Sequence, residues 1–315
     1  MSFPQELVDE ILSYLSSDDK QDQQSLRNCS LVAKSWINPS RRHLFKTILI
    51  RERDRQSWLD RISPSNIELL RHVRSFCFYG SDLWDRDPPS KFTDIEDLYV
   101  YFPSFRRLHT IDLCEAHISS DFPEQVEMFS PYQQVLSSLI LAAVSLPWRS
   151  FVALIDYFPN LRNLELQSLS FEDDNVNTPP LSRPLRGKLC FYLSEEEYLV
   201  SFSNWFTGLE VEYEELVIDV GYVSGTYSQR IATTCGKTLK HLRFQLCECV
   251  APWIILRTLA DPTLELAPLR VSFIIQNFVN WSSPRYTQHI HTRLPSLPSP
   301  PQTSGRSRFC HIPRL

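Results

Sequence analysis

The sequence predicts an α/β fold in which a short helical unit is followed by repeated strand–helix units. Two observations carry this prediction. Apolar residues recur at helical spacing over the first 48 residues, and from about residue 73 a strand pattern of the form L-x-x-L-x-L returns at regular intervals. The chain therefore divides into residues 1–48, residues 51–281 and a tail, residues 282–315.

The first 48 residues predict three helices and a strand. Pro4 suits a first helical turn, because its missing N–H would have no partner there, and Ser16–Asp19 end that helix. Its apolar stripe is Leu7, Ile11, Leu12 and Leu15. A second helix carries Leu26, Cys29, Ala33, Trp36 and Ile37 on one face. A third helix is expected to start at Pro39, capped by Asn38, before a strand at 47–50.

Three short helices bury too little surface to hide all of these apolar side chains. The surplus indicates an exposed patch that binds a partner. The alternative is an ordinary helical cap that seals the domain behind it, which requires the same periodicity.

The strings FPQELVDEILSYL, SLRNCSLVAKSW and RRHLFKTI resemble, in order and approximate spacing, the F-box motif of the expanded fungal F-box families, with Phe3 where leucine is commoner. The resemblance covers about fifty residues. It implies contacts with a Skp-type adaptor, and through it with a cullin and a ubiquitin-conjugating enzyme. The residues at motif positions that pack the bundle or meet the adaptor are Pro4, Leu7, Ile11, Leu15, Leu26, Leu31, Val32 and Trp36.

Beyond the first unit the chain repeats itself. Residues 101–108, YFPSFRRL, return as YFPNLRNL at 157–164, and each copy leads into a strand pattern. Strand units start at about 73, 108, 136, 161, 186, 213, 239 and 268, with spacings of 25 to 29 residues after a first one of 35. This period is typical of leucine-rich repeats and predicts an irregular solenoid with a curved parallel sheet and outer helices. The alternative is a generic α/β domain with leucine-rich strands.

Helical signals lie between the strands, as such a repeat requires. Capping-box pairs are expected at Thr93 with Glu96 and at Ser194 with Glu197. A stripe from Phe151 to Phe158 predicts another helix, and Pro252 opens a further one. Prolines at 103 and 159 are expected to stop the helices before the next strands.

Side chains between the strand leucines are expected to face the concave side of the sheet. This mixed polar row suits recognition of a protein surface better than a phosphate track or a small apolar ligand. The predicted cargo-binding residues are Tyr79, Asp112, Asn163, Glu165, Gln167, Asp219, His241 and Arg243. At any one position the alternative is a solvated side chain without a partner.

The composition argues against several classes of partner. The 315 residues carry a net charge of −5 with scattered Arg and Lys, which predicts no nucleic-acid partner. No signal peptide or apolar stretch of about 20 residues is visible, so we expect an intracellular protein with no membrane association and with eight reduced cysteines. The Pro/Ser-rich tail at 282–315 is expected to be disordered.

Catalytic motifs are missing from the sequence. No phosphate-cradling or dinucleotide-binding glycine motif is present, and we expect no cofactor. Cys235, Cys247, Cys249 and His241 lack the spacing of a structural zinc site, so no metal is expected. With the resemblance, the sequence predicts a non-catalytic substrate-recognition subunit of a Skp–cullin–F-box ubiquitin ligase. The alternative is an interaction scaffold without a role in ubiquitin transfer.

Overall fold

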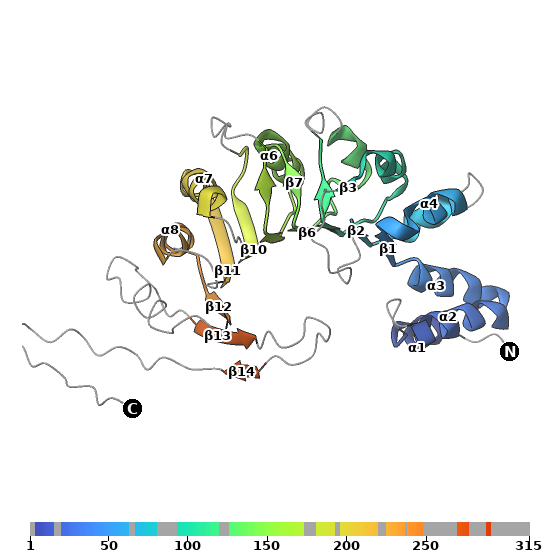
Figure 1. The fold of residues 1–315 in the computed structure, drawn as a ribbon. Coiled ribbons are helices and arrows are strands. Elements are labelled where there is room, and N and C mark those ends of the chain that lie inside the picture. Colours follow the sequence, from blue (N-terminus) through green and yellow to red (C-terminus); the bar gives the residue numbers. More distant parts are fainter. Residues whose placement is uncertain are drawn as a thin grey trace, which may run out of the picture.

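The computed structural model describes residues 4–15, 20–62, 67–80, 93–119, 126–172, 181–192, 196–219, 225–236, 238–247, 270–276 and 288–290. The fold is mixed α/β, with three N-terminal helices at one end of a parallel sheet (Figure 1).

The N-terminal helices are α1 (Gln5–Ser13), α2 (Lys20–Val32) and α3 (Lys34–Leu44), and α3 packs against both others. Val8, Leu12 and Leu26 form their buried centre, and Leu15, Cys29, Trp36 and Leu44 pack around it. This cluster is separate from the core of the sheet, which begins at Ile48. The boundary between the two units therefore lies before Ile48, and the strand at 47–50 belongs to the sheet.

The break between α2 and α3 lies at Ala33 and not, as predicted, at Asn38. Ala33 is extended, with φ −158° and ψ 157°, and its carbonyl accepts the Trp36 N–H at 2.9 Å. Pro39 is inside α3 and buried. The preference of proline for a first turn is overridden here, because the buried ring adds packing while the helix forgoes one backbone hydrogen bond.

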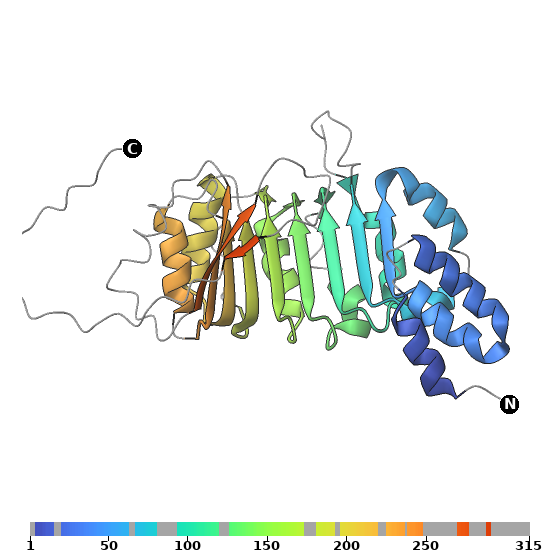
Figure 2. The same cartoon turned by 90° about the horizontal axis from the view of Figure 1, so that it is seen from below.

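The main sheet has ten strands in the order β1-β2-β4-β6-β8-β10-β11-β12-β13-β14, and every pairing but the last is parallel. Figure 1 shows the strands following one another along an arc with α6, α7 and α8 on its outer side, and Figure 2 shows the opposite, concave face. The strands are β1 (Thr47–Arg51), β2 (Ser75–Tyr79), β4 (Thr110–Cys114), β6 (Ser138–Ala142), β8 (Asn163–Gln167), β10 (Leu185–Tyr192), β11 (Val211–Asp219), β12 (His241–Cys247), β13 (Arg270–Gln276) and β14 (Gln288–Ile290).

The predicted strands of the main sheet are confirmed as β2, β4, β6, β8, β10, β11, β12 and β13, and their apolar residues are in register. One column of paired residues runs Phe76, Ile111, Leu139, Leu164, Leu189, Leu216, Leu242 and Val271. From Phe76 to Leu242 these side chains are all buried. Equivalent repeat positions thus occupy equivalent sites, because a residue that faced the other side of the sheet would lose its apolar burial.

The backbone turns a sharp corner directly after each of the strands β2, β4, β6 and β8, and the sequence did not predict these corners. Glu115, Ala143 and Ser168 have φ of 54°, 49° and 48°, in the left-handed region, and Gly80 holds the equivalent place. Each N–H donates to the last carbonyl of the next strand, for example Ala143 to Gln167 at 2.7 Å. The chain then enters a second, four-stranded sheet made of β3 (Thr93–Asp94), β5 (Ala116–His117), β7 (Ser145–Leu146) and β9 (Ser170–Phe171).

Helical segments connect the strands. They are α4 (Glu52–Arg61), α6 (Trp148–Tyr157), α7 (Glu196–Thr207), α8 (Gly225–Cys235) and the 3-10 segments η1 (Ile67–His72), η2 (Glu96–Ser104) and η3 (Val126–Tyr132). The helix predicted at 151–158 and its stop before Pro159 are confirmed by α6. The segments α4, η1, η3 and α8 were not predicted. Ser194 and Pro252 lie outside the described residues.

The predicted capping box at Thr93 is wrong. Thr93 belongs to β3, and its hydroxyl donates to the carbonyl of Gly80 at 3.0 Å. The Asp94 side chain instead accepts the N–H of Glu96 at 2.9 Å. The segment that follows, η2, is 3-10 and contains Pro103, which therefore does not stop it.

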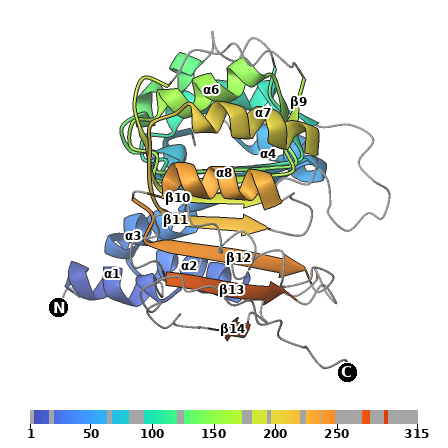
Figure 3. The same cartoon turned by 90° about the vertical axis from the view of Figure 1, so that its left-hand side faces the viewer.

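The C-terminal edge of the sheet carries β14, which pairs antiparallel with β13. Its three residues fall within the tail that was expected to be disordered, so that expectation is wrong at Gln288–Ile290. Figure 3 shows β14 beside β13, where it covers the open edge of the last parallel strand.

Within the described ranges, the helices are too short or too polar to cross a membrane.

Candidate functional site

Helix α1 has two apolar faces. Val8 and Leu12 are fully buried against α2 and α3. On another face, Leu7, Ile11 and Tyr14 are 45%, 42% and 79% exposed, at the i, i+4, i+7 spacing that aligns side chains along a helix. The predicted stripe therefore divides, because Leu7 and Ile11 point outward and Val8 takes the inward place.

The remaining predicted adaptor-binding residues are spread over the three helices. Pro4 is exposed ahead of α1, Leu26 is fully buried, and Leu15 and Trp36 are half-buried. Leu31 and Val32 end α2 with 84% and 67% of their surface exposed. Large apolar side chains are rarely this exposed side by side unless another molecule covers them.

The concave face of the main sheet brings the predicted cargo-binding residues into rows. Asn163 aligns with Ser138 and Lys188, while Glu165 aligns with Ile140 and Cys190. Tyr79, Asp112, Asn163, Glu165, Gln167, His241 and Arg243 are all half-buried on this face. The side chain of Asp219 lies outside the described residues, and its backbone pairs with Gln245.

Alternation along the strands also places one residue of β4 and one of β11 on this face, but both side chains are buried. Cys114 is 8% exposed and Val217 4%. The exposed part of the concave face is therefore more polar than the strand pattern predicts.

Two carboxylates on this face, those of Asp112 and Glu165, lower the stability of the fold because they are partly desolvated. The Tyr79 hydroxyl donates to Asp112 Oδ2 at 3.3 Å. Burial raises the pKa of Asp112 to about 6, and the nearby Glu165 carboxylate adds to this rise. Burial also raises the pKa of Glu165 above its ordinary value, although Lys188 opposes the rise. Neither carboxylate forms an ion pair with another described residue, and desolvated, unpaired carboxylates of this kind are typical of binding sites.

Asp112→Asn is expected to stabilise the fold at neutral pH. The folded-state pKa of about 6 lies above the unfolded value of about 3.9, so ionisation of Asp112 costs stability as the pH rises through this interval. Removing the charge should add about 1 to 2 kcal/mol to the free energy of unfolding at pH 7 and almost nothing at pH 3.5. Urea denaturation at the two pH values measures the difference. Equal stability of the variant and the unaltered chain at both pH values would contradict the prediction.

The other end of the concave face carries cations around one carboxylate. Glu215 Oε1 lies 3.6 Å from Lys188 Nζ and 3.3 Å from Arg243 Nε. His241 is directly opposite Glu215 in the strand register. The face thus presents acidic side chains near β4 and β8 and basic ones near β10 and β12, which suits a partner surface of alternating charge.

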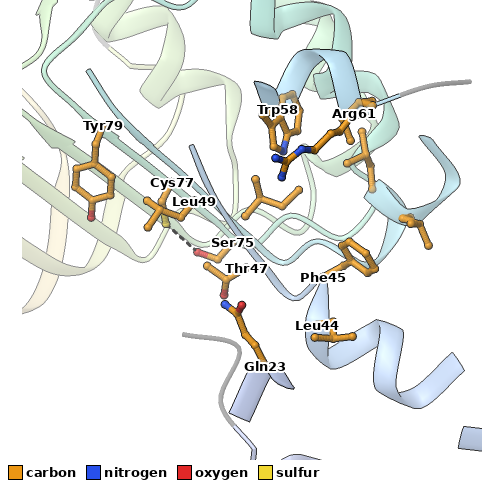
Figure 4. Close-up of a pocket in the computed structure, with 14 residues that line it drawn as sticks. Gln23, Leu44, Phe45, Thr47, Leu49, Trp58, Arg61, Ser75, Cys77 and Tyr79 are labelled. Atoms are coloured by element: carbon orange, nitrogen blue, oxygen red, sulfur yellow. Dashed lines mark hydrogen bonds between the residues drawn. The ribbon is translucent and has the colours of Figure 1, made fainter. Parts of the chain in front are cut away.

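A cavity of about 780 Å³ lies at the N-terminal end of the concave face. Figure 4 shows Tyr79, Cys77 and Leu49 from the strands on one side and Trp58 and Arg61 from α4 on another. The remaining lining residues are Gln23, Leu44, Phe45, Thr47, Ile48, Ile62, Leu69, Leu70 and Ser75. The strand β1 forms the edge of the sheet here, and Leu49 is 49% exposed.

Of the predicted cargo-binding residues only Tyr79 lines this cavity, because its walls come from α2, α3, α4, η1 and two strands. The sequence signal available for this cavity was Leu49, an apolar residue at an outward position of β1. The volume is within the range of sites that enclose a small ligand or a large side chain.

Comparison with protein-family models found no matching family. Comparison with curated proteins found no match either.

Within the described ranges, no three His, Cys, Asp or Glu side chains gather as a metal site would require. Of the residues considered for zinc, Cys235 is fully buried in α8, and burial raises the pKa of its thiol to about 12, which disfavours the thiolate that a metal needs. Cys249 lies outside the described residues.

Proposed function

We propose that this chain is a substrate-recognition subunit of a Skp–cullin–F-box ubiquitin ligase. In this proposal α1, α2 and α3 are the F-box and bind a Skp-type adaptor. The parallel sheet is a degenerate leucine-rich-repeat solenoid that binds a target protein. The chain performs no bond chemistry. It raises the local concentration of a target lysine near the conjugating enzyme, which carries out the transfer.

The exposed apolar face of α1 carries the proposal. A helix that only sealed the sheet would need a single apolar face, and that face would be buried. In α1 the side chains of Leu7, Ile11 and Tyr14 remain exposed, although the helix already has a complete buried face. Leu31 and Val32 add exposed apolar surface at the end of α2. The resemblance of the three sequence strings to the F-box motif assigns this surface to an adaptor.

The target-binding role rests on the concave face. Desolvation of the Asp112 and Glu165 carboxylates reduces the stability of the fold. The cavity beside Tyr79 offers an apolar recess at the end of the same face. A protein partner that supplies cations to the carboxylates and an apolar side chain to the cavity would compensate both.

Co-purification of the full chain with a purified Skp-type adaptor tests the proposal. Ile11→Asp and Leu7→Asp should each weaken adaptor binding at least tenfold, because a charge would be buried where an apolar contact is lost. The matched control is Val100→Asp, which places the same charge at a 71% exposed apolar residue of η2 and should leave binding unchanged.

Failure of the unaltered chain to bind the adaptor would remove the proposal. Adaptor binding without recruitment of a cullin would instead identify an interaction scaffold. Proximity labelling with the proteasome blocked would then identify the target, and its labelling should weaken when the concave face is altered.

A further inference from the structure

A second cavity, of about 220 Å³, lies where the N-terminal helices meet the start of the sheet. Its cationic side chains come from three segments that are far apart in the sequence. Arg42 and Lys46 flank the end of α3, Arg74 precedes β2, and Arg107 precedes β4.

Backbone hydrogen bonds between successive turns of the chain hold these segments together. The carbonyl of Lys46 accepts the N–H groups of Arg74 at 2.8 Å and Ser75 at 3.0 Å. The carbonyl of Arg74 in turn accepts those of His109 at 2.8 Å and Thr110 at 3.0 Å. The backbone at Lys46 and Arg74 is therefore fixed by the sheet, and Arg107 lies two residues before the bonded His109.

Most of the positive charge of the cavity is uncompensated. None of Arg42, Lys46, Arg74 and Arg107 forms an ion pair with any described residue. Asp9 of α1 is the acidic residue in the lining. Four cations around one carboxylate create a strong local positive potential, although the whole chain has a net charge of −5.

Two histidines, His43 and His72, complete the lining and respond to this potential. Burial and then Lys46 lower the pKa of His43, and Arg74 lowers it further while Asp9 opposes the shift. For His72, burial lowers the pKa first, followed by the charges of Arg71, Arg42, Arg107 and Arg41. Both rings are therefore held neutral and keep an N–H that can donate to an acceptor.

We propose that this cavity binds a phosphate group. Guanidinium groups match pairs of phosphate oxygens, and an anion would relieve the mutual repulsion of four cations. The volume is below that of sites for drug-sized ligands, so it suits a phosphate or diphosphate and not a nucleobase or a sugar ring. This inference does not rest on the proposed adaptor binding.

Calorimetric titration of the full chain with inorganic pyrophosphate, at fixed ionic strength, tests the site. We expect saturable binding with one site per chain. Arg74→Ala and Arg107→Ala should each weaken pyrophosphate binding at least tenfold, because each removes one of the four cations that line the cavity. Both side chains are exposed. Arg186→Ala is the matched control, since Arg186 is an exposed cation that pairs with Glu212 elsewhere, and it should bind as the unaltered chain does. Circular dichroism checks that each variant is folded.

Two further measurements sharpen the result. Bound pyrophosphate should raise the pKa of both His43 and His72, which NMR titration of the imidazole protons detects. A phosphoserine peptide, its unphosphorylated form and inorganic phosphate distinguish the sources of the group. Tighter binding of the phosphopeptide than of inorganic phosphate indicates a phosphorylated partner, and the reverse order indicates a free anion.

The proposal is overturned if neither pyrophosphate nor the phosphopeptide binds saturably. It is also overturned if Arg74→Ala and Arg107→Ala bind as well as the Arg186→Ala control.

Discussion

Gly187→Ala is expected to destabilise the fold by at least about 3 kcal/mol. Gly187 has a φ of 96°, a conformation that costs a residue with a Cβ about 1 to 2 kcal/mol. An added Cβ would also lie 2.2 Å from the carbonyl oxygen of Arg162 and 3.0 Å from its carbonyl carbon. These are backbone atoms of the neighbouring chain segment, so they cannot move aside as a flexible side chain would.

The location of Gly187 increases the effect. The residue lies at a bulge in β10, where the register with β11 shifts between Gly187 and Lys188. The next N–H, of Lys188, donates to the same Arg162 carbonyl at 2.7 Å. Displacing that carbonyl would disturb the pairing of β10 with β8 and with it the continuity of the sheet.

Urea denaturation of the purified variant measures the loss. Gly208→Ala is the matched control, because an added Cβ there would meet only the Trp205 carbonyl, at an ordinary 3.4 Å. It should change the free energy of unfolding by no more than about 0.5 kcal/mol. Similar stabilities of the two alanine variants would show that the close approach to Arg162 is relieved by a small backbone shift.

Phe102→Ala should cost about 3 to 5 kcal/mol. Phe102 is 1% exposed and lies at the centre of an aromatic cluster in the core. Its ring centroid is 5.2 Å from that of Phe76 on β2, 5.8 Å from Phe105 and 5.0 Å from Phe129 on η3. Removal of the ring leaves a cavity between two successive repeat units and loses aromatic contacts on both sides.

A matched series for thermal and urea denaturation consists of Phe102→Ala, Phe102→Leu and Val100→Ala. Val100 belongs to the same segment, η2, but is 71% exposed, so its truncation should cost no more than about 0.5 kcal/mol. Phe102→Leu should fall between the two. A loss below about 1 kcal/mol for Phe102→Ala would mean that the neighbouring rings close the cavity.

The strands were predictable because their signal is local and repeated. Leu139, Leu164 and Leu189 each follow the same short pattern, and a strand needs only a few such residues to bury one face. The polar residues between them, such as Asp112 and Glu165, were likewise placed correctly on the concave face by alternation alone. Helix ends were less predictable, as Ala33 and Thr93 show, because packing against other segments decided them.

The sequence by itself therefore determined the order of strands, the apolar columns of the core and the polar concave face, since all three follow from the periodicity of neighbouring residues. Only the tertiary structure decided which apolar residues of α1 face outward, because Leu7 and Val8 differ in burial and not in chemistry. It also gathered Arg42, Arg74 and Arg107, which the sequence shows as scattered charges. Such sites depend on contacts between distant segments, and local periodicity carries no information about them.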